Sequence, residues 1–171
     1  MNGLLLKLSP SEKKIFEIIS REAERLNYPV FAIGGYVRDK LIGRPCKDID
    51  IVCLGDAIKI AEAVASQFRP IPQVNYYPRF GTAMIRHHEL EIEFVGARKE
   101  SYVEDSRKPD VSPGTLEDDQ LRRDFSINAI SVSLNPENYG ELIDPFDGLD
   151  DLNAQVIRTP NNPDITFSDD P

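Results

Sequence analysis

Apolar residues recur with helical spacing near the start of the chain and predict a long amphipathic helix over residues 10–26. Ser9 precedes this segment as a candidate N-cap, Pro10 suits the first helical position, and Glu12 completes a Ser-x-x-Glu capping box. Residues three or four positions apart share one face of a helix, so the apolar stripe is expected to pack against a core. The stripe consists of Ile15, Ile18, Ile19, Ala23 and Leu26.

After this helix, short apolar runs alternate with amphipathic segments. Strands are predicted at residues 30–34 and 49–54, and helices at residues 36–41 and 56–67. Residues 81–97 alternate as a β-hairpin that turns at His87 and His88.

Residues 99–120 are polar and carry Pro109, Pro113 and Gly114, which favours a loop. A helix is predicted to begin near Asp124, followed by a strand, a turn and a short helix within residues 140–152. A last strand at residues 155–159 and a loop to the end complete the pattern. Alternating helices and strands with a hairpin among them indicate an α+β fold, with a mixed or antiparallel sheet that helices cover on one face.

Composition and charge narrow the class of protein. The 171 residues are 40% hydrophobic, which is enough for a buried core and argues against disorder. A net charge of −9 argues against coating of nucleic acid through clustered Lys and Arg, whereas a nucleotide held through metal ions is compatible with it. The sequence has no apolar stretch of transmembrane length and no signal segment, so we expect a cytoplasmic protein without membrane contacts. Cys46 and Cys53 are expected to be free thiols.

Two adjacent glycines, Gly34 and Gly35, stand where a strand is predicted to end and a helix to begin. Backbone N–H groups at a helix start attract anions, and the missing side chains let a phosphate approach the backbone closely. Arg38 follows one helical turn later and is a candidate for the same phosphates. The spacing does not fit the Gly-x-Gly-x-x-Gly pattern of dinucleotide-binding proteins. A tight strand-to-helix turn explains the glycines equally well, so they do not define a site by themselves.

Asp48 and Asp50 are two residues apart at the start of a predicted strand and therefore project from the same face. Carboxylates ~6–7 Å apart along a strand repel each other unless a cation lies between them. Mg²⁺ suits such a place because it often uses one or two carboxylates together with phosphate oxygens. A two-metal site needs a third acid on a neighbouring strand, and the alternating Glu89, Glu91 and Glu93 are candidates. The alternative explanation for both groups of acids is a solvated strand surface.

Five sequence blocks then resemble, in order, blocks of class II tRNA nucleotidyltransferases (CCA-adding enzymes) and bacterial poly(A) polymerases. These enzymes belong to the polymerase-β-like nucleotidyltransferase superfamily, and the resemblance extends from about residue 30 to residue 171. It departs mildly at Ser126, where Thr is usual, and at Asp169. The blocks are GGYVRDKLIGRPCKDIDIV, EIEFVGAR, DSRKPDVSPGTLEDDQLRRDFSINAI, LIDPFDGLDDL and FSDDP.

The resemblance implies roles for individual residues. Asp48, Asp50 and Glu93 would be catalytic and would bind Mg²⁺. A further set of residues would bind the nucleotide in three ways. Some would hold the triphosphate, some would approach the sugar or phosphates, and one would begin the Glu-Asp-x-x-Arg motif that reads the base. This set consists of Gly34, Gly35, Arg38 and Arg123 for the triphosphate, Asp124 and Asn128 for the sugar or phosphates, and Asp170 for the base. Arg98 and Arg122 are further candidates, and a salt bridge explains Arg122 as well as a ligand contact does.

The resemblance also implies a domain arrangement and an activity. Residues 1–160 would form the catalytic head domain and residues 161–171 the start of a neck, with the rest of the neck, the body and the tail absent from the chain. The enzyme would transfer CMP or AMP from CTP or ATP to the 3′-hydroxyl of tRNA or another RNA, releasing pyrophosphate by a two-metal mechanism. Asp50 or Glu93 is the candidate proton acceptor. We expect the isolated chain to be poorly active, because the Arg of the base-reading motif and the RNA-gripping domains are not in it.

Several activities stay open at this point. Full CCA addition, partial C- or A-addition and poly(A) synthesis share the blocks above. A non-catalytic nucleotide-binding module would keep the binding residues without transfer, and a metal-dependent phosphohydrolase would use the same acids on a nucleoside triphosphate without an RNA acceptor.

Overall fold

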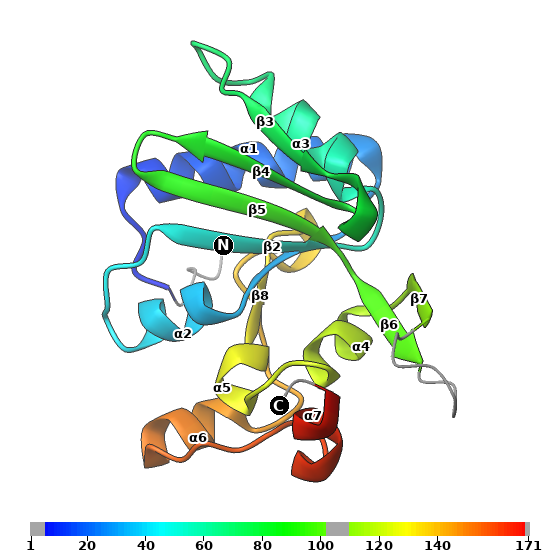
Figure 1. The fold of residues 1–171 in the computed structure, drawn as a ribbon. Coiled ribbons are helices and arrows are strands. Elements are labelled where there is room, and N and C mark those ends of the chain that lie inside the picture. Colours follow the sequence, from blue (N-terminus) through cyan, green and yellow to red (C-terminus); the bar gives the residue numbers. More distant parts are fainter. Residues whose placement is uncertain (1–5, 102–109, 170–171) are drawn as a thin grey trace.

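A mixed β-sheet with helices forms the body of the protein (Figure 1). The computed structural model describes residues 6–101 and 110–169. Within these residues, seven strands form one sheet in the order β3-β4-β5-β2-β1-β8-β9, and β6 and β7 form a separate pair. The strands are β1 (Val30–Ile33), β2 (Asp48–Cys53), β3 (Val74–Tyr77), β4 (Thr82–His87), β5 (Leu90–Gly96), β6 (Arg98–Ser101), β7 (Asp110–Pro113), β8 (Ser131–Ser133) and β9 (Leu142–Ile143).

Helices accompany this sheet, and the predicted α+β class is confirmed. No helix of residues 6–101 and 110–169 has the length and apolar character needed to cross a bilayer. The α-helices are α1 (Pro10–Leu26), α2 (Gly35–Leu41), α3 (Ala57–Ala65), α4 (Leu116–Leu121), α5 (Ser126–Ala129), α6 (Gly148–Ala154) and α7 (Pro163–Asp169), and two 3₁₀ turns are η1 (Pro78–Phe80) and η2 (Pro136–Asn138).

Helix α1 begins with the predicted capping box. Ser9 Oγ accepts a hydrogen bond from the Glu12 backbone N–H (3.3 Å), and Glu12 Oε2 accepts one from the Ser9 N–H (2.7 Å). The same carboxylate accepts hydrogen bonds from Tyr36 Oη (3.1 Å) and pairs with Lys40 Nζ (2.5 Å). The cap therefore also joins α1 to α2, the helix that follows the two glycines.

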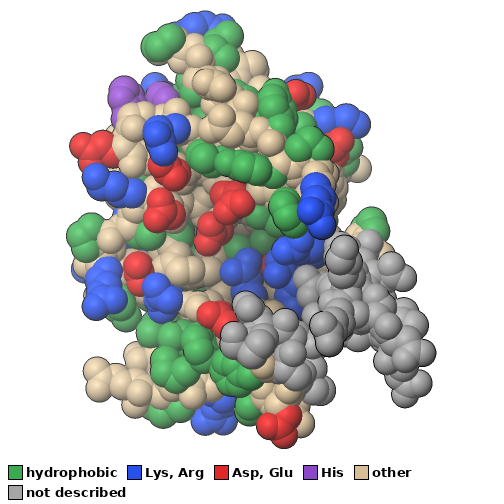
Figure 2. Space-filling model, viewed as in Figure 1, with side chains coloured by type: hydrophobic (Ala, Val, Ile, Leu, Met, Phe, Trp, Pro, Cys, Tyr) green, Lys and Arg blue, Asp and Glu red, His purple; other side chains and the backbone are tan. Residues whose placement is uncertain are grey.

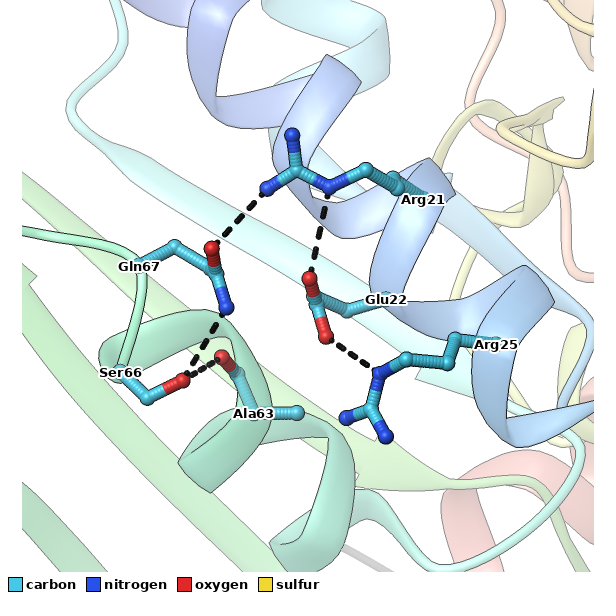
Figure 3. Close-up of polar contacts among 6 residues, drawn as sticks. All are labelled: Arg21, Glu22, Arg25, Ala63, Ser66 and Gln67. Atoms are coloured by element: carbon cyan, nitrogen blue, oxygen red, sulfur yellow. Dashed lines mark hydrogen bonds and ion pairs between the residues drawn. The ribbon is translucent and has the colours of Figure 1, made fainter.

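Helices α1 and α3 cover one face of the sheet, and α1 lies behind the sheet in Figure 1. A polar contact also joins α1 to the turn that follows α3, where Arg21 Nη2 donates to Gln67 Oε1 at 3.1 Å (Figure 3). The buried Glu22 carboxylate there accepts from Arg21 and Arg25. Between helices and sheet, alternate strand residues form the main core, with Ile49 and Ile51 from β2, Ile85 from β4, and Ile92 and Phe94 from β5 fully buried.

The segment predicted as a loop over residues 99–120 contains regular structure. Strands β6 and β7 pair antiparallel, and Thr115 caps α4 by accepting from the Asp118 N–H (3.1 Å). Residues 102–109 of that prediction lie outside the described residues. The Thr-x-x-Asp spacing of Thr115 and Asp118 is a capping pattern that indicates the start of α4. The loop prediction instead followed the prolines and the glycine that precede it.

Three other expectations differ from the structure. Helix α5 begins at Ser126 rather than near Asp124, and the chain then enters the short strand β8. Residues 155–159 are not a strand: Val156 and Ile157 are exposed and have no ladder partner among the described strands. The expected terminal loop contains α7, whose start is stabilised by Asn162, since its side chain accepts from the Asp164 N–H (3.0 Å).

Helices α5 and α6 approach closely at Gly148. A Cβ placed on Gly148 would lie 2.4 Å from the Ser126 carbonyl oxygen. Ser126 Oγ donates to Asp151 Oδ2 (2.6 Å), so the hydroxyl at this position, where the resembled family usually has Thr, ties the two helices together. Helix α5 also carries Asn128, so this contact supports a predicted nucleotide-binding residue.

We expect Gly148→Ala to lower the free energy of unfolding by about 1–3 kcal/mol or more, because the added methyl must displace backbone. Gly96→Ala is the matched control, since its Cβ would meet its nearest neighbour at 3.6 Å, an ordinary contact. Urea denaturation followed by circular dichroism measures both. Equal midpoints for the two variants would show that the helices can separate without cost.

Candidate active site

The pairing of β2 with β5 brings the predicted acids together. The two strands are parallel, with Asp48 opposite Glu91 and Asp50 opposite Glu93. Directly opposed residues project from the same face of a sheet, and neighbouring strands lie ~4.8 Å apart. The intervening residues Ile49 and Ile92 project into the core on the other face, so the four carboxylates all project from the face that α1 and α3 leave open.

A cavity of about 550 Å³ opens above these carboxylates. Figure 2 shows acidic side chains gathered at the centre of this face, with Lys and Arg side chains directly below them. The wall combines acids with aromatic, aliphatic and basic residues. It is formed by Asp48, Ile49, Asp50, Tyr77, Phe80, Thr82, Met84, Glu91, Glu93, Val95, Arg98 and Arg122.

Asp50 has the most strongly perturbed environment among the predicted acids. Burial raises the pKa of its carboxyl group to about 6, Arg123 opposes this shift, and the charges of Glu93 and Asp48 add to it. A carboxylate with this pKa is only partly balanced by its surroundings. Additional positive charge at this place would therefore favour its ionised form.

Gly34 allows Arg123 and Asp50 to approach the end of β1. The backbone of Gly34 has φ +79°, and a Cβ there would lie 2.9 Å from both Asp50 Oδ2 and Arg123 Nη1. Both conditions favour glycine at this position. The two predicted residue groups, glycines and acids, therefore meet at one point.

Arg123 is held by a buried carboxylate. Asp119 is 0% exposed and accepts from Arg123 Nη2 (3.2 Å) and from Arg122 Nη2 (2.5 Å). Within the described residues, Arg123 Nε is buried without a hydrogen-bond partner. An arginine that is fixed on one side and has unused donor capacity is suited to an anionic ligand.

A second, smaller cavity of about 320 Å³ lies between these arginines and the acids. Its wall includes Asp50, Glu93, Arg122, Arg123 and Asp124. Opposite charges thus line one small space, an arrangement suited to a ligand that carries phosphates together with cations.

The remaining predicted residues form a hydrogen-bonded chain between α2 and α5. Arg38 Nη1 donates to Asn128 Oδ1 (2.6 Å), and Asn128 Nδ2 donates to Asp124 Oδ1 (3.0 Å). Gly35 joins this group, because a Cβ on it would lie 3.4 Å from Arg38 Nη2. The residues to which the resemblance gave roles thus lie in these neighbouring groups, whereas Asp170 lies outside the described residues. Glu89, a candidate for the third acid, is instead exposed and pairs with Lys47.

The donor set fits a divalent cation that shares its ligands with a substrate. Within residues 6–101 and 110–169, no three His, Cys, Asp or Glu side chains are arranged to enclose an ion by themselves. Mg²⁺ does not require such a cage, because it commonly binds through one or two carboxylates and substrate phosphates. Oxygen donors and the uncompensated charge around Asp50 match that mode of binding.

Sequence reasoning missed several residues of this site. Asp119 was not selected, although its spacing of three and four residues from Arg122 and Arg123 was an available signal. The sequence offered the Tyr76-Tyr77 pair as a candidate for stacking on a base, but partial burial near Pro78 was the preferred explanation, whereas both side chains are nearly half exposed. Phe80 was not selected, because its position beside the acids depends on the pairing of β3 with β4.

Solved structures show which class of protein this fold and site define. A CCA-adding enzyme in an apo form superimposes with a TM-score of 0.84 at 37% identity, covering 96% of this chain and 38% of that chain. A tRNA nucleotidyltransferase complexed with a primer tRNA and an incoming ATP analogue gives a TM-score of 0.76 at 38% identity, covering 90% of this chain and 41% of that chain. The fold is that of nucleotidyltransferases, as the sequence resemblance implied.

The family follows from the sequence match. The family model described as "Poly A polymerase head domain" matches residues 30–158, and the chain belongs to this family. The A-adding tRNA nucleotidyltransferase of Aquifex aeolicus is 43% identical over 141 residues, which is 82% of this chain and 17% of the relative. The chain therefore spans well under half the length of these relatives.

The raised pKa of Asp50 predicts a pH-dependent cost in the metal-free protein. The carboxyl group of Asp50 has a pKa near 6 in the folded protein and an ordinary value of 3.8. Its ionisation therefore lowers the free energy of unfolding progressively as the pH rises from about 3.8 through 6, and the cost is absent while the group is protonated. We therefore expect Asp50→Asn to be more stable than the wild type at pH 8, by on the order of 2–3 kcal/mol, with the difference vanishing near pH 4. Chemical denaturation in EDTA across this pH range measures it.

Glu89→Gln is the control for this experiment. Its exposed carboxylate pairs with Lys47, which holds the pKa of Glu89 below its usual value, so its effect has the opposite sign. Equal pH dependence in Asp50→Asn and the wild type would contradict the assigned environment of Asp50.

Proposed function

We propose that this chain is the catalytic head domain of a template-independent RNA nucleotidyltransferase. It transfers CMP or AMP from CTP or ATP to the 3′-hydroxyl of tRNA and releases pyrophosphate. The observation that carries this proposal is the single cavity that Asp48, Asp50 and Glu93 share, beside Gly34 and Arg123, in a chain of this family. Residues 1–160 form the head in this proposal, and residues 161–171 begin a neck.

The names of similar proteins support the choice of substrates. A related structure is described as a tRNA nucleotidyltransferase with a primer tRNA and an incoming ATP analogue, and another as a CCA-adding enzyme with ATP. The acidic charge of the chain, −9, is compatible with a head domain that contacts only the end of the RNA.

Mg²⁺ is the proposed cofactor, and Asp48, Asp50 and Glu93 are the residues that would hold it. When bound, divalent cations neutralise triphosphate charge and favour ionisation of the attacking hydroxyl group. The protein supplies the complementary part: Arg123, fixed by Asp119, binds phosphate oxygens, and the bare backbone at Gly34 and Gly35 leaves space for them.

The transfer itself is an in-line displacement at phosphorus. The RNA 3′-oxygen forms a bond to the α-phosphorus, the bond from the α-phosphorus to the bridging oxygen breaks, and pyrophosphate departs with that oxygen. The hydroxyl proton passes to water or to a carboxylate, for which Asp50 and Glu93 are the candidates. Arg123 balances charge on the departing pyrophosphate, and Arg38 with Asn128 orients the nucleotide from α2 and α5.

Asp48→Ala and Asp50→Ala tested separately in the full-length protein should each lower the rate of nucleotide addition by about a thousandfold or more, because each removes a cation ligand that acts in the transition state. A primer-extension assay on tRNA lacking its 3′ end measures this. Glu89→Ala, an exposed carboxylate paired with Lys47, should leave the rate near that of the wild type. Near-normal addition by both aspartate variants would refute the proposed site.

The same assay separates the possible activities when each nucleotide is supplied in turn. Addition of two C residues and one A residue defines full CCA synthesis. Addition of only C or only a terminal A defines partial C- or A-addition, and long A tracts define a poly(A) polymerase. Nucleotide binding by calorimetry without extension would instead favour a non-catalytic module, and phosphate release without RNA would favour a hydrolase.

A further inference from the structure

Two half-exposed aromatic side chains line the cavity above the carboxylates of β2 and β5, which we call the acidic cavity. Tyr77 ends β3 with 44% exposure, and Phe80 closes η1 with 58% exposure. Both line the 550 Å³ cavity together with Asp48, Asp50 and Glu93. Ligand-binding cavities commonly combine aromatic side chains with a few polar groups, as this wall does.

The sheet order places these rings on one side of the acids and the phosphate-binding residues on the other. Strand β1, which leads into Gly34, adjoins β2, whereas β3 and β4 lie beyond β5. Tyr77 pairs with Thr82 of β4, and both line the cavity. The carboxylates of β2 and β5 therefore lie between the Gly34–Arg123 side and the Tyr77–Phe80 side.

The chemistry of the proposed function, on which this inference rests, assigns different ligands to the two sides. In an in-line displacement, the attacking and departing oxygens lie on opposite sides of the phosphorus. If pyrophosphate departs toward Arg123 and Gly34, the attacking 3′-oxygen approaches from the side of β4 and β3. The nucleotide that carries this oxygen then meets Tyr77 and Phe80.

A neighbouring cavity continues from the aromatic pair. It has a volume of about 970 Å³ and shares Phe80 and Arg98 with the acidic cavity. Its wall includes Arg79, whose guanidinium carbon lies 5.7 Å from the centre of the Phe80 ring. Cavities of about 300–1,000 Å³ accommodate small organic ligands, so the two spaces together suit a terminal nucleotide and the one before it, with arginines near the connecting phosphate.

We propose that Tyr77 and Phe80 form a stacking platform for the base of the 3′-terminal nucleotide of the RNA acceptor. Stacking uses the face of a base and not its edge, so the platform holds the terminal nucleotide whichever base it carries. That property suits an enzyme whose acceptor end changes with every nucleotide added. The two residues are positioning residues, because they orient the attacking hydroxyl group without touching the reacting atoms.

Alanine substitutions in the full-length protein test this platform. Tyr77→Ala and Phe80→Ala should each raise KM for the RNA acceptor by about tenfold, in line with the loss of one base–aromatic contact, with KM for CTP and ATP nearly unchanged. Tyr77→Phe and Phe80→Trp keep an aromatic face and should retain most of the wild-type affinity. Because both side chains are half exposed, thermal melting should show that all variants fold.

Tyr76→Ala is the matched control. Tyr76 is the preceding residue, is 48% exposed, and projects from the opposite face, where its hydroxyl group donates to Glu62 at 3.0 Å. Its loss should leave KM for RNA unchanged. A rise in KM for CTP or ATP in the Tyr77 and Phe80 variants, with KM for RNA unchanged, would overturn the proposal, as would no change in either constant.

A fluorescence measurement separates this inference from the proposed function. A tRNA ending in 2-aminopurine should lose fluorescence on binding to the wild type or Tyr76→Ala in the absence of nucleotide, because stacking quenches this base. The quenching should be largely lost with Tyr77→Ala or Phe80→Ala, and equal quenching by all four proteins would overturn the platform. If the wild type adds no nucleotide to any RNA, the proposed function fails, and the quenching result still decides whether the aromatic pair binds an RNA end.

Discussion

The register between β2 and β5 is the constraint on which the rest of the structure depends. It sets Asp50 opposite Glu93 on the open face and, through strict alternation, puts Ile49 and Ile92 into the core on the other. A slip of one residue would exchange these faces, burying carboxylates and exposing isoleucines. Core packing against α1 and α3 therefore secures the position of the acids, so stability and site geometry come from the same pairing.

Gathering acids on one face has an electrostatic cost that the basic residues reduce only in part. The fully buried Asp119 accepts hydrogen bonds from Arg122 and Arg123 and so holds their guanidinium groups near the acids. The pKa of Asp50 nevertheless stays raised, since burial outweighs the attraction of Arg123. The metal-free site thus keeps unbalanced negative charge, and added cations would favour its ionised carboxylates, as the proposed binding of a triphosphate with its counterions requires.

The edge of the sheet gives the site its asymmetry. Strands β3 and β4 extend the sheet beyond β5, and Tyr77 and Phe80 line the cavity there. Arginines and glycines lie on the opposite side, next to β1. The carboxylates of β2 and β5 therefore have arginines and glycines on one side and an aromatic pair on the other. In the proposed function, this division would give each reactant of the displacement at phosphorus its own approach to the same centre.

The sequence by itself determined the elements and residues whose signals are local. The capping box of α1, the hairpin of β4 and β5, and the spacing of Asp48 and Asp50 follow from neighbouring residues, and the family resemblance pointed to Glu93 and Arg123. Only the tertiary structure decided what depends on distant pairing. It placed Tyr77 and Phe80 beside the acids through the β3–β4 ladder, buried Asp119 beneath the arginines, and left residues 155–159 without a sheet partner. Side-chain environment is set by what folds against it, and no local pattern encodes that contact.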